Sequence, residues 1–195
     1  MMPDKHPVNH ERITCPQDAK NLARLDWVQA CYNARWRIAQ KYQPKTIFEI
    51  GVMAGYSAHA WITGSDRTEV YVGWDIDDRK HYGGPWLYWA RLLLDTLKVQ
   101  WEITEIDSQK VEKVVERYDL IHVDGDHTYD GCFHDMSICW PAVKPGGVMV
   151  VDDATYLPGP RKACWQFSQE VQGARTIYLE PSPAGSMVYE KGVGG

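Results

Sequence analysis

The sequence predicts an α/β fold with a doubly wound, mostly parallel sheet between two layers of helices and an antiparallel hairpin at the C-terminus. Short apolar segments bounded by turn residues alternate with amphipathic segments of helical length along most of the chain. Such alternation is typical of parallel strands, because each parallel crossover needs a dozen or more residues. Only the last two apolar segments, 174–179 and 186–190, follow each other as closely as hairpin strands do.

The elements are expected in a regular order along the chain. Apolar residues at helical spacing over residues 17–42 predict one or two helices, which end before Pro44. The strands expected before the hairpin are 46–50, 69–74, 99–105, 120–123 and 148–151. The helices expected between and after them are 57–63, 86–97, 110–117, one between residues 124 and 148, and one near 161–172.

Length and charge limit the class of protein. A chain of 195 residues suits one domain, which we place at residues 17–195 after a flexible segment at 1–16. A net charge of −5 argues against a nucleic-acid partner, because phosphate binding needs a basic surface. Since the sequence shows no membrane-spanning run and no secretory signal, we expect a cytoplasmic protein with no membrane partner. The five cysteines form no CxxC pair and are expected to be reduced; a homo-oligomer stays open.

Acidic residues follow two neighbouring strands of the predicted sheet. The segment 120–123 ends at Asp124, with His127 three residues later, and the segment 148–151 ends at Asp152 and Asp153. Carboxyl ends of neighbouring parallel strands meet at the edge where open α/β folds bind ligands. Carboxylates packed together repel one another, so the cluster needs a cation, a proton or good solvation. The pattern predicts a divalent-metal site with a base beside it.

A glycine turn follows the first predicted strand directly. Glu49, Gly51, Gly55 and Ser57 lie in the segment EIGVMAGYS, where a strand, a turn and a helix follow one another. This arrangement lets a ligand approach the main chain and the helix N-terminus. The GxxxG spacing differs from the GxGxxG of dinucleotide enzymes, which argues against nicotinamide or flavin. A turn that binds nothing is the alternative.

Polar residues at the ends of the next two strands extend this candidate cofactor site. Asp75 lies roughly 20 residues beyond the turn, where an acid holds ribose hydroxyls in nucleotide-binding folds, and Asp77 is its rival. Asp107, Ser108 and Gln109 follow the third strand and offer a carboxylate, a hydroxyl and an amide to an adenine ring. Asp107 or Ser108 could also cap a helix.

Together these motifs resemble class I S-adenosylmethionine-dependent methyltransferases, which implies a Rossmann-like fold. The shared features are Glu-x-Gly-x-x-x-Gly-x-Ser after the first strand, the acids after the second and third, and Lys-Pro-Gly-Gly at residues 144–147. The resemblance covers residues 44–190 and is nearest to metal-dependent O-methyltransferases of the catechol and macrolide-sugar (macrocin) types. The segment HVDGDHTYDG, with VVDDA, also resembles small bacterial methyltransferases of unassigned substrate.

The resemblance implies a role for each candidate residue. On the cofactor side these are Glu49, Gly51, Gly55 and Ser57 for the methionine moiety, Asp75 for the ribose, Asp107, Ser108 and Gln109 for the adenine, and Asp124 nearby. Asp124, Asp152 and Asp153 would hold a metal, usually magnesium. His127 would be the base, where catechol-type enzymes have lysine and macrolide-sugar enzymes histidine. The catechol pattern has asparagine at Asp153 and a substrate-gripping acid near the C-terminus that we do not find, so catechol is not expected.

The residues therefore favour a magnesium-assisted O-methyltransferase that acts on a hydroxylated small molecule, a sugar or a phenol. The metal would lower the pKa of the hydroxyl, and His127 would remove its proton. Alternatives are a metal-free methyltransferase, another enzyme class on the same scaffold and a non-catalytic nucleotide-binding protein. We expect His122 to be a buried structural histidine, and His134 and Asp135 to be structural or exposed.

Overall fold

The structure is a computed structural model that describes residues 25–76 and 86–193. Several sequence expectations lie outside these residues: the flexible segment 1–16, the first part of the N-terminal helix and the rival acid Asp77. The placement of a single domain at residues 17–195 therefore stays a prediction.

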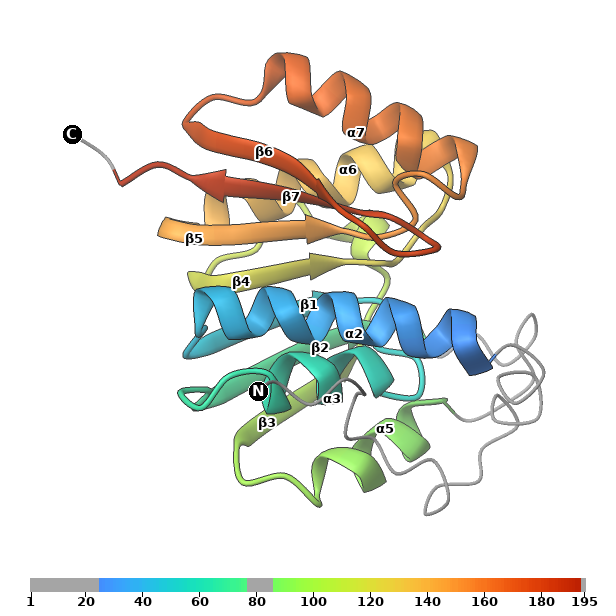
Figure 1. The fold of residues 1–195 in the computed structure, drawn as a ribbon, viewed down its shortest axis with the longest axis vertical. Helices are drawn as coiled ribbons and strands as arrows, with labels where there is room; N and C mark the ends of the chain where they lie inside the picture. The colour runs from blue at the N-terminus through green and yellow to red at the C-terminus, as the bar shows by residue number, and fades with distance from the viewer. Residues whose placement is uncertain (1–24, 77–85, 194–195) are drawn as a thin grey trace.

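Within the described residues, seven strands form one sheet in the order β3-β2-β1-β4-β5-β7-β6 (Figure 1). The parallel strands are β1 (Thr46–Ile50), β2 (Val70–Asp75), β3 (Gln100–Glu105), β4 (Tyr118–Val123) and β5 (Val143–Val151). The antiparallel strands are β6 (Ala174–Glu180) and β7 (Ser186–Lys191). The predicted fold class is confirmed. The strand order reverses between β1 and β4, which is where open α/β sheets bind ligands.

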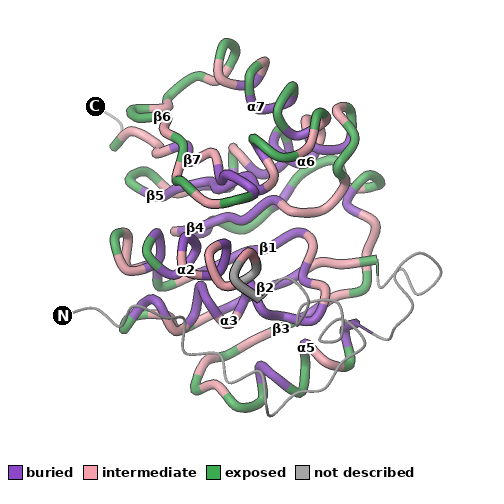
Figure 2. The backbone as a smooth tube through the Cα atoms, turned by 45° about the vertical axis from the view of Figure 1, so that its right-hand side comes forward, coloured by how far each residue is buried: buried purple, intermediate pink, exposed green. Residues whose placement is uncertain are grey.

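Helices cover both faces of the sheet, as predicted. The helices α2 (Leu25–Tyr42), α3 (Tyr56–Thr63) and α5 (Trp86–Leu94) lie on one face, and α6 (Tyr129–Cys139) and α7 (Pro158–Glu170) lie on the other (Figure 1). Successive side chains of a strand point to opposite faces. Ile47 of β1 therefore packs in one core with Trp61, and Phe48 packs in the other with Met136. Buried residues follow the central strands β1, β4 and β5 (Figure 2).

The predicted helix over residues 110–117 is wrong. The chain forms one 3₁₀ turn, η2 (Ser108–Lys110), and reaches β4 without further regular structure. Asp107 caps the turn by accepting a hydrogen bond from the Gln109 main-chain N–H at 3.1 Å. Among residues 111–117 only Val114 is buried and Val111 is partly buried, so a helix here would have only a narrow apolar face to cover. The β-branched valines of the segment also lower its helix propensity.

Other boundaries differ by a few residues. The helix predicted over 86–97 ends at Leu94, where the Thr96 hydroxyl donates to the Leu93 carbonyl at 2.6 Å. The strand predicted over 148–151 already begins at Val143, which pairs with Tyr118 of β4. The four described cysteines are free and buried, as expected. Among the described helices, none has the length and apolar character that a membrane crossing requires.

Candidate active site

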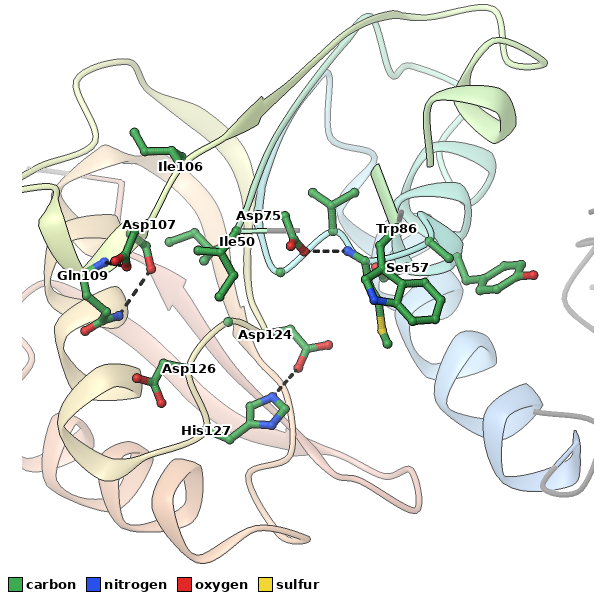
Figure 3. A pocket seen from close by; sticks show the side chains of 18 of the residues that line it. Ile50, Ser57, Asp75, Trp86, Ile106, Asp107, Gln109, Asp124, Asp126 and His127 are labelled. Atoms are coloured by element: carbon green, nitrogen blue, oxygen red, sulfur yellow. Dashed lines mark hydrogen bonds and ion pairs between the residues drawn. The ribbon is translucent and has the colours of Figure 1, made fainter. Parts of the chain in front are cut away.

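A cleft of about 800 Å³ opens at the carboxyl ends of β1, β2, β3 and β4 (Figure 3). Each of these strands contributes the residues of the turn that follows it. The predicted site residues that line it are Gly51, Ser57, Asp75, Asp107, Ser108, Gln109, Asp124 and His127. Trp86 also lines the cleft, and so do Tyr32 and Arg35, which the sequence did not single out. The parallel strands thus bring most of the predicted residues around one cavity.

The turn after β1 needs glycine at its first position. Gly51 has φ +90°, and its N–H donates to the Trp74 carbonyl of β2 at 2.8 Å. A Cβ added at Gly51 would lie 1.9 Å from the main-chain oxygen of Asp124. The Met53 N–H donates to Asp75 Oδ2 at 2.8 Å, so Asp75 ties the turn to the end of β2 (Figure 3). These contacts hold the turn after β1 against the ends of β2 and β4.

Replacing Gly51 by alanine is expected to lower the free energy of unfolding by about 3 kcal/mol, since both the positive φ and the contact with Asp124 oppose a side chain. Gly146→Ala is the matched control, because Gly146 has φ +80° but no atom within 4 Å of the added Cβ. The Gly146 variant therefore measures the free-energy cost of the positive φ alone, about 1 kcal/mol. Urea denaturation of the two variants measures the difference. Equal losses would contradict the close-approach argument.

The residues predicted for an adenine also form local structure. Asp107 caps η2 and pairs with Lys110 at 3.0 Å, and the Lys110 hydrogen bond lowers the pKa of that carboxyl. The Gln109 side-chain amide donates to Asp135 Oδ1 on α6 at 2.8 Å. Asp135 is fully buried, and burial raises its pKa to about 6. The helix-cap alternative for Asp107 is therefore realised, while Asp107, Ser108 and Gln109 still line the cleft.

Two predicted cofactor residues do not line the cleft. Glu49 is fully buried in β1, where it accepts a hydrogen bond from the Tyr71 hydroxyl and lies 2.6 Å from His122 Nδ1. His122 is thus the buried structural histidine that the sequence predicted. Gly55 has φ +82° and lies within reach of the α5 main chain at Ala90, so it supports the turn from behind. Both residues act through the backbone that faces the cleft.

The four residues of the predicted metal and base site lie together. His127 Nε2 is 3.1 Å from Asp124 Oδ1 (Figure 3) and 3.7 Å from Asp153 Oδ2. Ligand atoms of Asp124, His127 and Asp153 lie within 4.8 Å of one another, and those of His122, Asp124 and Asp152 do so too. Asp152 is buried, and its Oδ1 accepts a hydrogen bond from the Ser186 hydroxyl at 2.8 Å. Asp124 belongs to both groups and joins the cluster to the cleft.

Arg35 of α2 is the residue that the sequence argument missed. Its Nη2 contacts Asp152 Oδ2 and lies 3.5 Å from Asp124 Oδ2. Burial opposes its charged form, but Asp152 and Asp124 raise the pKa of Arg35 above its ordinary value, so it stays charged. A signal was present, because Arg35 stands in the helical stripe with the buried residues Cys31, Ile38 and Ala39. A charge in an apolar stripe is rare unless it is paired.

The neighbouring charges shift the pKa values of the cluster in opposite directions. The hydrogen bond with Asp124 raises the pKa of His127 to about 9. Burial, with the charges of Asp124 and Asp152, raises the pKa of Asp153 to about 7. Burial alone would raise the pKa of Asp124, but the His127 hydrogen bond and the charges of His122 and Arg35 hold it below its usual value. The charge of Arg35 and the raised pKa values of His127 and Asp153 thus reduce the net negative charge of the cluster.

Comparison with known proteins assigns this arrangement to a family. A family model described as a methyltransferase domain matches residues 48–154, which is more than half of the chain. The mycinamicin VI 2''-O-methyltransferase of Micromonospora griseorubida is 27% identical over 149 residues, which cover 69% of this chain and 34% of that protein. The chain therefore spans about a third of the length of this curated relative.

Solved O-methyltransferase structures share the fold at low sequence identity. An enzyme of tomaymycin synthesis from Streptomyces achromogenes, in complex with SAM, superposes with a TM-score of 0.62 at 15% identity and covers 93% of this chain and 92% of its own. An O-methyltransferase from Bacillus cereus, in complex with SAH, gives a TM-score of 0.61 at 16% identity, with 82% and 80% covered. These likenesses concern the fold.

Proposed function

The chain belongs to the class I S-adenosylmethionine-dependent methyltransferases, and from this we propose that it methylates a hydroxyl of a small molecule, a sugar or a phenol. One observation supports this best: Asp124 and His127 line the cleft and also belong to the acidic cluster. A methyl donor in the cleft and an acceptor at the cluster would therefore meet at a base. The curated relative is itself named an O-methyltransferase.

On this proposal the turns around the cleft hold the cofactor. Gly51 and Ser57 would face the methionine moiety, with Glu49 and Gly55 behind them, and Asp75 would hold the ribose. The adenine contacts would come from Asp107, Ser108 and Gln109, with Asp124 nearby. The helix α3 begins directly after the glycine turn, so main-chain N–H groups that pair with no carbonyl of the helix itself lie near Ser57.

His127 is proposed as the base. Methyl transfer from a sulfonium is an in-line displacement: the acceptor oxygen forms a bond to the methyl carbon as the sulfur–carbon bond breaks. A neutral hydroxyl is a poor nucleophile and must lose its proton around the transition state. The imidazole of His127 is half-exposed beside Asp124, so a hydroxyl can reach it. The hydrogen bond with Asp124 holds the ring in place for that transfer.

We propose that a divalent cation, magnesium, assists the reaction at Asp124, Asp152 and Asp153. The donor chemistry fits, because carboxylate oxygens are the ligands of hard cations, and ligand atoms of Asp152 and of Asp153 each lie within 4.8 Å of one of Asp124. When bound, such a cation lowers the pKa of a hydroxyl and orients it. One observation favours the metal-free alternative instead: Arg35 already supplies a positive charge to Asp124 and Asp152.

Two measurements test the proposal. Calorimetry with S-adenosylmethionine, with and without MgCl₂, should show binding; no binding under either condition would reject the function. Methyl transfer to a panel of hydroxylated sugars and phenols, followed by mass spectrometry, would identify the acceptor. Transfer that persists in EDTA would reject the metal role and keep the enzyme. If the wild-type chain instead depends on magnesium, Asp152→Ala should abolish that dependence.

Asp75→Ala is expected to weaken binding of S-adenosylmethionine by roughly tenfold or more, because each lost hydrogen bond to a charged group is worth about 1.5–3 kcal/mol. The substitution would remove the hydrogen-bond acceptor for the ribose hydroxyls and also the acceptor for the Met53 N–H. Asp95→Ala, an exposed acid outside the cleft, is the control and should bind normally. Calorimetry measures both variants. An unchanged affinity in Asp75→Ala would remove it from the cofactor site.

A further inference from the structure

Arg35 occupies the inner half of the acidic cluster. It contacts Asp152 and lies 3.5 Å from Asp124, two of the three members of the inner group that His122 completes. The side chain of Arg35 is 7% exposed and that of Asp152 is 5% exposed, so the pair is shielded from water. A guanidinium keeps its charge at any pH at which a protein folds. The cluster therefore carries a permanent cation of its own.

We propose that Arg35 competes with a divalent cation for Asp124 and Asp152, and so sets a low affinity of the acidic cluster for that ion. The inference rests on the proposed function in so far as it takes the cluster to be a cation site. It concerns binding alone, and it holds whether or not the ion takes part in methyl transfer. Arg35 acts through the two carboxylates and is a positioning residue.

Two donors already contact the carboxylate of Asp152. Each of its oxygens already accepts a hydrogen bond, Oδ1 from the Ser186 hydroxyl and Oδ2 from Arg35. An ion at Asp152 must share these oxygens with two donors, one of which is positively charged. Water screens this repulsion poorly, because both side chains are buried. The arginine therefore lowers the affinity for an ion more than an exposed arginine at the same distance would.

Two buried nitrogen atoms near the inner group lack a hydrogen-bond partner among the described residues. Arg35 Nε and His122 Nε2 have no hydrogen-bond partner among the described residues, although both atoms are buried. Native structures rarely leave such atoms unpaired. His122 offers a ring nitrogen within 4.8 Å of the Asp124 and Asp152 ligand atoms. The inner group therefore has a potential nitrogen ligand for a metal besides the two carboxylates that Arg35 faces. Removal of the guanidinium would leave two carboxylates and one imidazole as potential ligands, with no positive charge contacting the carboxylates from Arg35.

The test measures binding of MgCl₂ and MnCl₂ alone to metal-free protein, by calorimetry and by Mn²⁺ electron paramagnetic resonance. Arg35→Gln should bind Mn²⁺ roughly tenfold tighter or more than wild type, since a nearby positive charge is removed. Arg35→Lys keeps the charge and should stay near wild type. Arg37→Gln is the matched control: the same helix, but a half-exposed arginine paired with Glu180 at 2.9 Å.

Each outcome decides the proposal. Equal Mn²⁺ affinities for Arg35→Gln and wild type would overturn it, and so would a Lys variant that binds as tightly as the Gln variant. If Arg35→Gln unfolds without metal, millimolar Mn²⁺ should restore the fold and raise the unfolding temperature far more than in wild type. A variant that stays unfolded at saturating Mn²⁺ would contradict the proposal. Binding of S-adenosylmethionine is measured separately, so its failure would reject the proposed function and not this inference.

Discussion

Replacing His127 by alanine is expected to lower the rate constant for methyl transfer by about 10²–10⁴-fold, the usual contribution of a positioned general base. Binding of S-adenosylmethionine should change only a few-fold, because His127 stands at the rim between the cleft and the acidic cluster. Single-turnover transfer, with an acceptor from the sugar and phenol panel, measures the chemical step. His134→Gln is the control, since His134 Nε2 contacts the main-chain oxygens of Ser108 and Val111 away from the cluster.

The pH dependence of the same rate separates a base from a residue that only orders the loop. His127 accepts a proton only when neutral, and its pKa is raised to about 9 by the hydrogen bond with Asp124. Without divalent cation the rate should therefore rise with pH, reach half its maximum near pH 9 and level off about one pH unit above that. A cation bound beside His127 disfavours the imidazolium, so MgCl₂ should move the rise to lower pH. A flat profile under both conditions, or full activity in His127→Ala, would remove His127 as the base.

Local patterns and the rules of parallel sheets were enough to predict most of the cleft. Asp75 ends β2, and Asp107 and Asp124 follow β3 and β4; parallel strands bring these ends to one edge whatever lies between them in sequence. The glycine turn was predictable because Gly51 has a backbone conformation that other residues rarely adopt. Chain order and strand polarity therefore determine this part of the site.

The remaining features depend on contacts between distant residues. Arg35 lies 117 positions from Asp152, and nothing in its own segment indicates which acid it meets. Glu49 follows the motif spacing of a cofactor residue, but the alternation of β1 points it toward His122 inside the protein. The helix predicted over 110–117 rested on local periodicity, which cannot show that Val111 and Val114 pack against the core while Val115 stays exposed. Such pairings require the three-dimensional arrangement.

Glu49→Ala is expected to lower the free energy of unfolding by about 2–5 kcal/mol, because each buried polar group left without its partner costs about 1–3 kcal/mol. Glu49 and His122 are both fully buried, and the substitution removes the partner of His122 Nδ1 and of the Tyr71 hydroxyl together. Tyr71→Phe leaves the Glu49–His122 pair in place and should cost only about 1–3 kcal/mol. Urea denaturation of both variants, with S-adenosylmethionine affinity measured on folded protein, checks the assignment. If the alanine variant kept wild-type stability but lost the cofactor, Glu49 would be a ligand-binding residue. The expected opposite pattern makes it the buried support on which the end of β1, and with it the glycine turn, is built.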